Sequence, residues 1–291
     1  MNKRTPNIKD KFDLGIIPRL LLFILIPNVF TTPLRIFVEA VIEGKSGAPE
    51  FITLPFLIYG VCAELVVGIG YTVIGYKLPV KSRILRGFTY IMLILISSYL
   101  PNILAMLGGD GKIIEESLTV GIVVVDVLSY AIKGIVLGLL MRNYDVRNSA
   151  PPRVISNPVM VLASLINGVV FALLNIITDA VAGAVDSTWR LSSILGVSPT
   201  RESIFYIVFI AFMFLAGVVL TIWYRYCLPE KAGLVGRVLF ALELSAIVWL
   251  PNVLIMAFFG TSYIMTIAYG IAYVIMILIC TLLYGVGRKN G

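Results

Sequence analysis

Eight long apolar runs constrain this chain more than any other feature of its sequence. To within a few residues they cover 16–42, 52–76, 85–107, 117–141, 158–183, 203–225, 234–258 and 262–286. Each is long enough to cross a bilayer as a helix, which takes about 20 residues. Charged residues make up 13% of the chain, whereas soluble domains carry about 25%. The sequence therefore predicts an all-α integral membrane protein with eight transmembrane helices.

The lysines and arginines predict how these spans are oriented. Seventeen of the 23 fall in the N-terminal segment, the C-terminal segment and the loops 77–86, 142–157 and 225–237, whereas four fall in the loops on the opposite side. Because cytoplasmic loops are rich in Lys and Arg, we expect both termini to be cytoplasmic, in the cell membrane. The first run is too long for the apolar core of a signal peptide, so we interpret it as a retained span. Topology alone then explains the net charge of +7, without a nucleic-acid partner, and the basic loops are expected to attract anionic lipid head groups.

An internal repeat organises the eight runs. The phrase YLPNILAM at 99–106 returns as WLPNVLIM at 249–256, and residues 76–106 laid over 226–256 share nine identities. At an offset of 140, Pro18 falls on Pro158 and Glu39 on Asp179, which places about ten extra residues in the loop 184–201. Four spans per half is an even number, so the two halves enter the membrane in the same direction. We predict two tandem parallel four-helix repeats, 1–150 and 151–291, with the interface between them as the natural place for a shared polar site.

The repeated phrase centres on a Pro-Asn pair. Pro101-Asn102 and Pro251-Asn252 occupy equivalent positions in the third and seventh runs, and a further pair, Pro27-Asn28, lies in the first. A proline inside a helix removes a backbone donor and kinks the helix, and the neighbouring asparagine can bond the freed backbone or another helix. Two interpretations remain open: a duplicated kink that shapes packing, or a pair of broken helices that flank a site or a gate.

Seven ionisable residues fall inside the apolar runs and are the candidate site residues. Each costs a few kcal/mol at membrane depth, so each is expected to face protein or water. They are Arg35, Glu39, Glu64, Asp126, Lys133, Asp179 and Glu243. Arg35 and Glu39 are four residues apart, so they can pair on one helical face, either as an interhelical polar seam or as an outward vestibule.

Two further expectations concern how these charges pair. Asp126 and Lys133 lie about 10 Å apart along one helix, which is too far for an ion pair. Lys133 lies at a depth comparable to Glu243, so we predict a Lys133–Glu243 ion pair that joins the two halves. Glu64 has no basic residue within a turn of its own helix and is expected to be an isolated carboxyl, either protonated as in proton-coupled carriers or hydrogen-bonded to a neighbouring helix.

Close helix packing is signalled by Gly134 and Gly138. They form a G-x-x-x-G pattern, which lets another helix approach closely.

Catalytic signatures are missing from the sequence. The chain has no histidine, no G-x-S-x-G and no H-E-x-x-H, so we predict no cofactor, no metal and no catalytic residue. The pattern favours a permease for a small solute, an ion or a lipid, with its polar site between the repeats. A non-catalytic anchor or scaffold subunit, which binds other membrane proteins or copies of itself, is the alternative, and an intramembrane enzyme is a third.

Overall fold

The structure, a computed structural model, describes residues 15–42, 54–99, 120–141, 157–228, 233–254 and 262–287, and its regular secondary structure over these ranges is helical throughout. We call residues 1–150 the first half and 151–291 the second half. The first half contributes α1 (Ile16–Phe37), η2 (Val38–Ile42), α2 (Leu54–Val73), η3 (Gly75–Lys77), α3 (Arg83–Ile94), η4 (Leu95–Tyr99) and α6 (Val120–Leu140). The second half contributes α7 (Asn157–Val185), η6 (Ser187–Trp189), α8 (Leu191–Ile194), α9 (Glu202–Cys227), α10 (Leu234–Val248), α11 (Leu250–Leu254) and α12 (Tyr263–Gly287).

Five of the helical stretches are long and apolar enough to cross a membrane. They are Ile16–Val41, Gly121–Leu140, Pro158–Val185, Glu202–Cys227 and Tyr263–Tyr284. Their outward faces carry exposed aliphatic and aromatic side chains, for example Leu21, Leu25 and Phe30 on α1 and Leu162 and Ile166 on α7. Exposed apolar surface on this scale is not stable in water. The fold is therefore that of an α-helical membrane protein.

The other three predicted spans differ from single long helices. The apolar part of α2, Leu57–Val73, is shorter than a full span. The third predicted span begins as α3 and continues as the π-helical segment η4 up to Tyr99, and Pro101-Asn102 lie outside the described residues. The seventh is interrupted between α10 and α11, because Pro251 offers no backbone donor to the carbonyl of Ile247. The helix is therefore interrupted next to Pro251, whereas Pro27 lies inside α1, which runs through it.

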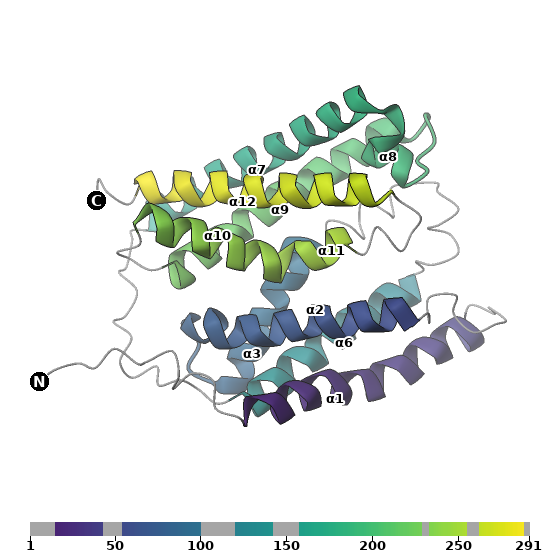
Figure 1. Ribbon diagram of the computed structural model, residues 1–291, viewed down its shortest axis with the longest axis vertical. Coiled ribbons are helices and arrows are strands. Elements are labelled where there is room, and N and C mark those ends of the chain that lie inside the picture. The colour runs from purple at the N-terminus through teal and green to yellow at the C-terminus, as the bar shows by residue number, and fades with distance from the viewer. Residues whose placement is uncertain are drawn as a thin grey trace, which may run out of the picture.

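The helices of each half lie together, as Figure 1 shows, with α1, α2, α3 and α6 on one side and α7, α9, α10 and α12 on the other. In the first half α6 packs on both α1 and α3, and in the second half α12 packs on both α7 and α10. The two halves meet where α2 contacts α10 and where α9 contacts η3 and η4.

Aromatic rings and small residues form the contact between the halves. The rings of Tyr90 and Trp223, from α3 and α9, meet edge to face at 5.5 Å, and both side chains are fully buried. A methyl group added at Gly70 would lie 2.5 Å from the side chain of Ile247, so this glycine lets α2 and α10 approach each other. At the end of the interface Lys77 donates from Nζ to the backbone oxygen of Cys227 at 3.1 Å.

The G-x-x-x-G prediction in α6 is confirmed, and its partner is α3. A Cβ atom on Gly87 would lie 2.4 Å from the carbonyl oxygen of Gly134 and 2.5 Å from the backbone nitrogen of Gly138. A Cβ atom on Gly138 would lie 2.5 Å from the carbonyl oxygen of Arg83. These are backbone contacts that a flexible side chain cannot relieve. The three glycines therefore set the distance between α3 and α6.

One basic side chain of the loop 77–86 is not available to lipid. Arg86 is 2% exposed and donates from Nε to the carbonyl oxygen of Val80 at 2.8 Å, so it holds the loop together. Lys81 and Arg83 are exposed in the same loop. The predicted attraction of head groups to this loop rests on these two residues.

Candidate polar site in the first half

An inner cluster joins three helices of the first half through Glu64 of α2. The Nζ atom of Lys133 on α6 lies 2.6 Å from Oε1 of Glu64. Asn28 of α1 donates from Nδ2 to both oxygens of Glu64, at 3.2 Å and 3.0 Å. The side chains of Lys133 and Glu64 are only 20% and 15% exposed. We call Asn28, Glu64 and Lys133 the inner cluster.

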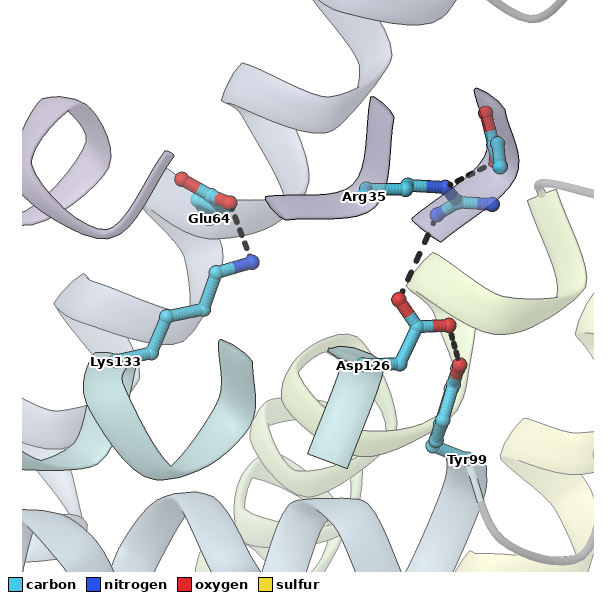
Figure 2. A network of polar contacts seen from close by, with 6 residues as sticks. Arg35, Glu64, Tyr99, Asp126 and Lys133 are labelled. Atoms are coloured by element: carbon cyan, nitrogen blue, oxygen red, sulfur yellow. Dashed lines mark hydrogen bonds and ion pairs between the residues drawn. The ribbon is translucent and has the colours of Figure 1, made fainter. Parts of the chain in front are cut away.

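An outer cluster lies two helical turns away. Arg35 on α1 bonds from Nε to Glu39 of η2 at 3.0 Å and faces Asp126 of α6, with 3.5 Å between Nη1 and Oδ1. The hydroxyl of Tyr99, at the end of η4, donates to the other carboxylate oxygen of Asp126. We call Arg35, Glu39, Tyr99 and Asp126 the outer cluster. Figure 2 shows how Arg35 points between its two acids while Lys133 reaches Glu64.

The two clusters share the same pair of helices. Asn28 and Arg35 are seven residues apart on α1, and Lys133 and Asp126 are seven apart on α6, which is about 10 Å along each axis. The ring of Tyr130 lies between them, with its centroid 5.1 Å from that of Tyr99 and 5.9 Å from the Nζ atom of Lys133. The arrangement is a ladder of polar groups along the contact between α1 and α6.

Two members of the outer cluster lie on π-helical segments. Glu39 belongs to η2 and Tyr99 to η4. Such segments are rare in proteins, but those that do occur are frequently found at functional sites. They turn a side chain toward a position that a regular α-helix does not reach. Here Glu39 of η2 contacts Arg35, and Tyr99 of η4 contacts Asp126, so the two segments supply one partner each to the Arg35–Asp126 pair.

Three predictions about these charges need correction. Lys133 is paired with Glu64 within the first half, whereas Glu243 is exposed on α10, so the Lys133–Glu243 ion pair is wrong. Glu64 is not an isolated carboxyl, because its basic partner comes from another helix and not from its own turn. The polar site also lies inside the first half and not between the halves, as the partners on α1, α2 and α6 show. The predicted Arg35–Glu39 pair is confirmed.

Asp179 occupies a different environment in the second half. It accepts the backbone N–H of Leu191 at 2.7 Å and the hydroxyl of Tyr206 at 2.6 Å. Its carboxylate therefore holds the start of the short helix α8, within the loop that the sequence comparison identified as longer in this half. Asn175 bonds the carbonyl of Phe171 on its own helix at 2.8 Å. These residues stabilise the fold of the second half and do not extend the ladder.

Two buried side-chain donors lie next to the break in the seventh predicted span. The side-chain nitrogens of Trp249 and Asn252 are buried and have no hydrogen-bond partner in the part of the chain that the structure describes. Trp249 stacks on Tyr273 of α12, with ring centroids 4.6 Å apart. Buried donors without acceptors are costly, but within the described ranges the long helix α9 also carries one, the indole nitrogen of Trp223, so they do not distinguish this segment from a regular span.

Sequence reasoning missed Tyr99, Tyr130 and the role of Asn28 as a partner of Glu64. A signal was present for Tyr99, since it is the first residue of the repeated Pro-Asn phrase and tyrosine carries a donor that must be satisfied when buried. Nothing in the sequence pointed to the partner that Asn28 would choose. Among the described residues no group of three or more metal-ligating side chains occurs.

Comparison with protein-family models, with curated proteins and with solved structures finds no match to this chain.

Proposed function

We propose that the protein is a membrane permease whose polar site is the ladder formed by the inner and outer clusters. The observation that carries this proposal is the placement of five charged side chains on the apolar helices α1, α2 and α6 and on η2, where they form two groups of ion pairs. On insertion scales a charged residue at the centre of a span costs about 2.5–3.5 kcal/mol. In membrane proteins such groups typically mark the path of an ion or a substrate.

Packing in the second half supports the view that these charges serve function and not stability. At the offset of 140, Gly168 aligns with Asn28, and at the offset of 150, Phe214 aligns with Glu64. Gly168 and Phe214 are also neighbours, because a Cβ atom on Gly168 would lie 2.8 Å from the Phe214 ring. The same pair of positions is therefore filled by a polar contact in one half and by an apolar contact in the other.

A similar comparison applies to Lys133. Residues 129–141 laid over 272–284 place Tyr130 on Tyr273 and Lys133 on the buried Met276. Tyr130 contacts the ring of Tyr99, and Tyr273 contacts the ring of Trp249, which aligns with Tyr99 at the offset of 150. Because well-packed apolar residues replace buried ion pairs without loss of stability in many proteins, the polar version is not required for folding.

The division of the chain also fits a permease. Two parallel repeats, related by an axis along the membrane normal, allow one half to move against the other, and here that movement would change access to a site that lies within the first half. The interruption between α10 and α11 would supply the element that moves. Pro251 is then a hinge of the gate, and we propose the same role for Pro101.

A triple substitution tests the proposal. Asn28→Gly/Glu64→Phe/Lys133→Met writes the apolar residues of the second half into the first. We expect this variant to fold and to lose transport, because it removes the inner cluster while restoring a packing that the chain already uses. Wild-type proteoliposomes are incubated with a small-molecule extract of the source cells, and the compounds they accumulate are identified by mass spectrometry.

The matched control for this variant is Glu243→Gln, which neutralises an acid on α10 outside the ladder. It is expected to accumulate the same compounds as wild type. Wild-type proteoliposomes that accumulate nothing beyond empty liposomes, or a triple variant that transports normally, would contradict the proposed site.

A membrane anchor or scaffold subunit is the second candidate, and the exposed Glu243 favours it. A carboxylate on the outer face of a span is unfavourable in lipid and would be better placed against another polypeptide. Native mass spectrometry of protein extracted gently from its own membrane separates the two functions. A fixed ratio to other polypeptides would identify a subunit, whereas a single chain or a homo-oligomer with a bound small molecule supports the permease.

Cysteine labelling tests the proposed eight-span topology with cytoplasmic termini. A cysteine in place of the exposed Lys81 is expected to react with a membrane-impermeant maleimide only after the membrane is opened. A cysteine in place of Thr200, in the exposed loop before α9, is expected to react from outside. Labelling is measured in a background with Cys62 replaced by alanine, because Cys62 is exposed. Both positions labelled from the same side would overturn the topology.

A further inference from the structure

The outer cluster contains more negative than positive charge. Arg35 is the cation that contacts both Glu39 and Asp126, at 3.0 Å and 3.5 Å. In the inner cluster Lys133 and Glu64 balance each other at 2.6 Å. With all five side chains charged, the ladder has three carboxylates and two cations. Among the residues that the structure describes, one negative charge therefore remains without a matching cation, and an unpaired charge is strongly unfavourable in a region of low dielectric.

We propose that Asp126 binds a proton, and that this proton is the coupling ion of the transport proposed above, on which the inference rests. The outer cluster then becomes neutral when Asp126 is protonated and carries one negative charge when it is not. A substrate or a conformational change that favours one of the two states is thereby linked to proton uptake or release.

Geometry selects Asp126 and not Glu39 as the proton site. The Nε atom of Arg35 is closer to Glu39, whose side chain is 11% exposed, whereas Asp126 has the longer contact to the guanidinium. Asp126 also meets the hydroxyl of Tyr99, a group that both donates and accepts a hydrogen bond. A protonated Asp126 can donate to the Tyr99 oxygen, so a hydrogen bond can join the two side chains in either protonation state.

The groups that face Asp126 come from four elements. Arg35 lies on α1, Glu39 on η2 and Tyr99 on η4, and Lys133 acts from two turns away on α6. Lys133 is in direct contact with Glu64, whose charge it balances, and reaches Asp126 only over this longer distance. The Arg35 side chain is 38% exposed, so the outer cluster is not sealed inside the protein. The proton passes between solvent and a carboxylate oxygen, and no other bond changes.

Infrared spectroscopy of the full chain in lipid detects this proton directly. Surface carboxyls ionise near pH 4, so the C=O stretch of a carboxylic acid at pH 7 reports a carboxyl held in its protonated form. We expect wild type to show such a band and Asp126→Asn to lose a component of it. Arg35→Gln should enlarge the band, because Glu39 and Asp126 then lack their cation and a second carboxyl takes up a proton.

Asp179→Asn and Glu243→Gln are the matched controls, since both remove an acid from an apolar helix outside the ladder. Neither is expected to remove the component assigned to Asp126. A spectrum unchanged by Asp126→Asn, or a wild type without the band, overturns the proton site, and Arg35→Gln decides the matter if Asp126→Asn does not fold.

Transport assays keep the inference separate from the proposed function. Accumulation by wild type is expected to depend on a pH gradient, and Asp126→Asn is expected to lose that dependence. Accumulation without pH dependence overturns the coupling while the permease stands. A proton on Asp126 in a protein that transports nothing overturns the permease and, with it, the coupling.

Discussion

Replacing Gly87 with leucine is expected to separate α3 from α6 and to cost at least about 3 kcal/mol of folding free energy. Overpacking of a core commonly costs about 1–3 kcal/mol, and the cost is higher where the obstacle cannot move. Here the first added carbon would lie 2.4 Å from the Gly134 carbonyl oxygen, which is backbone. Unfolding in mixed micelles with increasing dodecyl sulfate, followed by tryptophan fluorescence, measures the loss.

Gly60→Leu is the matched control for that variant. Gly60 also lies within an apolar helix, α2, and a Cβ atom there meets nothing within 4 Å. This substitution is expected to leave the unfolding transition within about 0.5 kcal/mol of wild type, as is usual for surface positions. A Gly87→Leu variant as stable as the Gly60→Leu variant would show that α3 and α6 are not held together through their glycines.

Replacing Glu64 with leucine is expected to destabilise the protein by about 3–5 kcal/mol. The substitution leaves the Lys133 ammonium, which is 20% exposed, without the carboxylate 2.6 Å away. Removal of one partner of a buried pair is costly because the other charge stays desolvated. Asn28 loses its interhelical acceptor at the same time but keeps its bond to the carbonyl of Ile24.

Glu64→Leu/Lys133→Met is expected to recover most of that loss, since it removes both charges and fills the space with apolar atoms. The two variants are compared with wild type by the same unfolding measurement. If the double variant were no more stable than Glu64→Leu, the penalty would come from lost packing and not from an unpaired charge. Transport should be absent in both variants, so stability and function separate in the double variant alone.

Local patterns were predicted correctly where the sequence itself fixes the geometry. Arg35 and Glu39 are four residues apart, and this spacing brings them onto one helical face whatever surrounds the helix. The glycines at 134 and 138 likewise marked a close approach, because a surface without Cβ atoms is available to any neighbour. The interruption after Trp249 follows from Pro251, which breaks the hydrogen-bond pattern of any helix that contains it.

Pairings between helices were predicted less well. The similar depth of Lys133 and Glu243 predicts an ion pair, yet depth is one coordinate and a contact requires three. Lys133 reaches Glu64 because α1 packs against both α6 and α2, whereas α10 packs mainly against α12, α11 and α2. The sequence around Glu64 predicts an isolated carboxyl, because no basic residue lies within one turn of it. Its partner Lys133 comes from another helix, which the local sequence does not reveal.

Three properties follow from the amino-acid sequence alone: that the chain lies in a lipid bilayer, that it is helical, and which charged residues fall within its apolar helices. Apolar runs of this length leave the backbone no hydrogen-bond partners except those within a helix, so these properties follow from composition and spacing. The tertiary structure decided that the charges gather in the first half, with Arg35 shared between two acids and Lys133 on Glu64. Side-chain contacts between helices depend on how each helix is rotated about its axis and on which helices are its neighbours. Packing at a few glycines and aromatic residues sets both, and the periodicity along a single helix encodes neither.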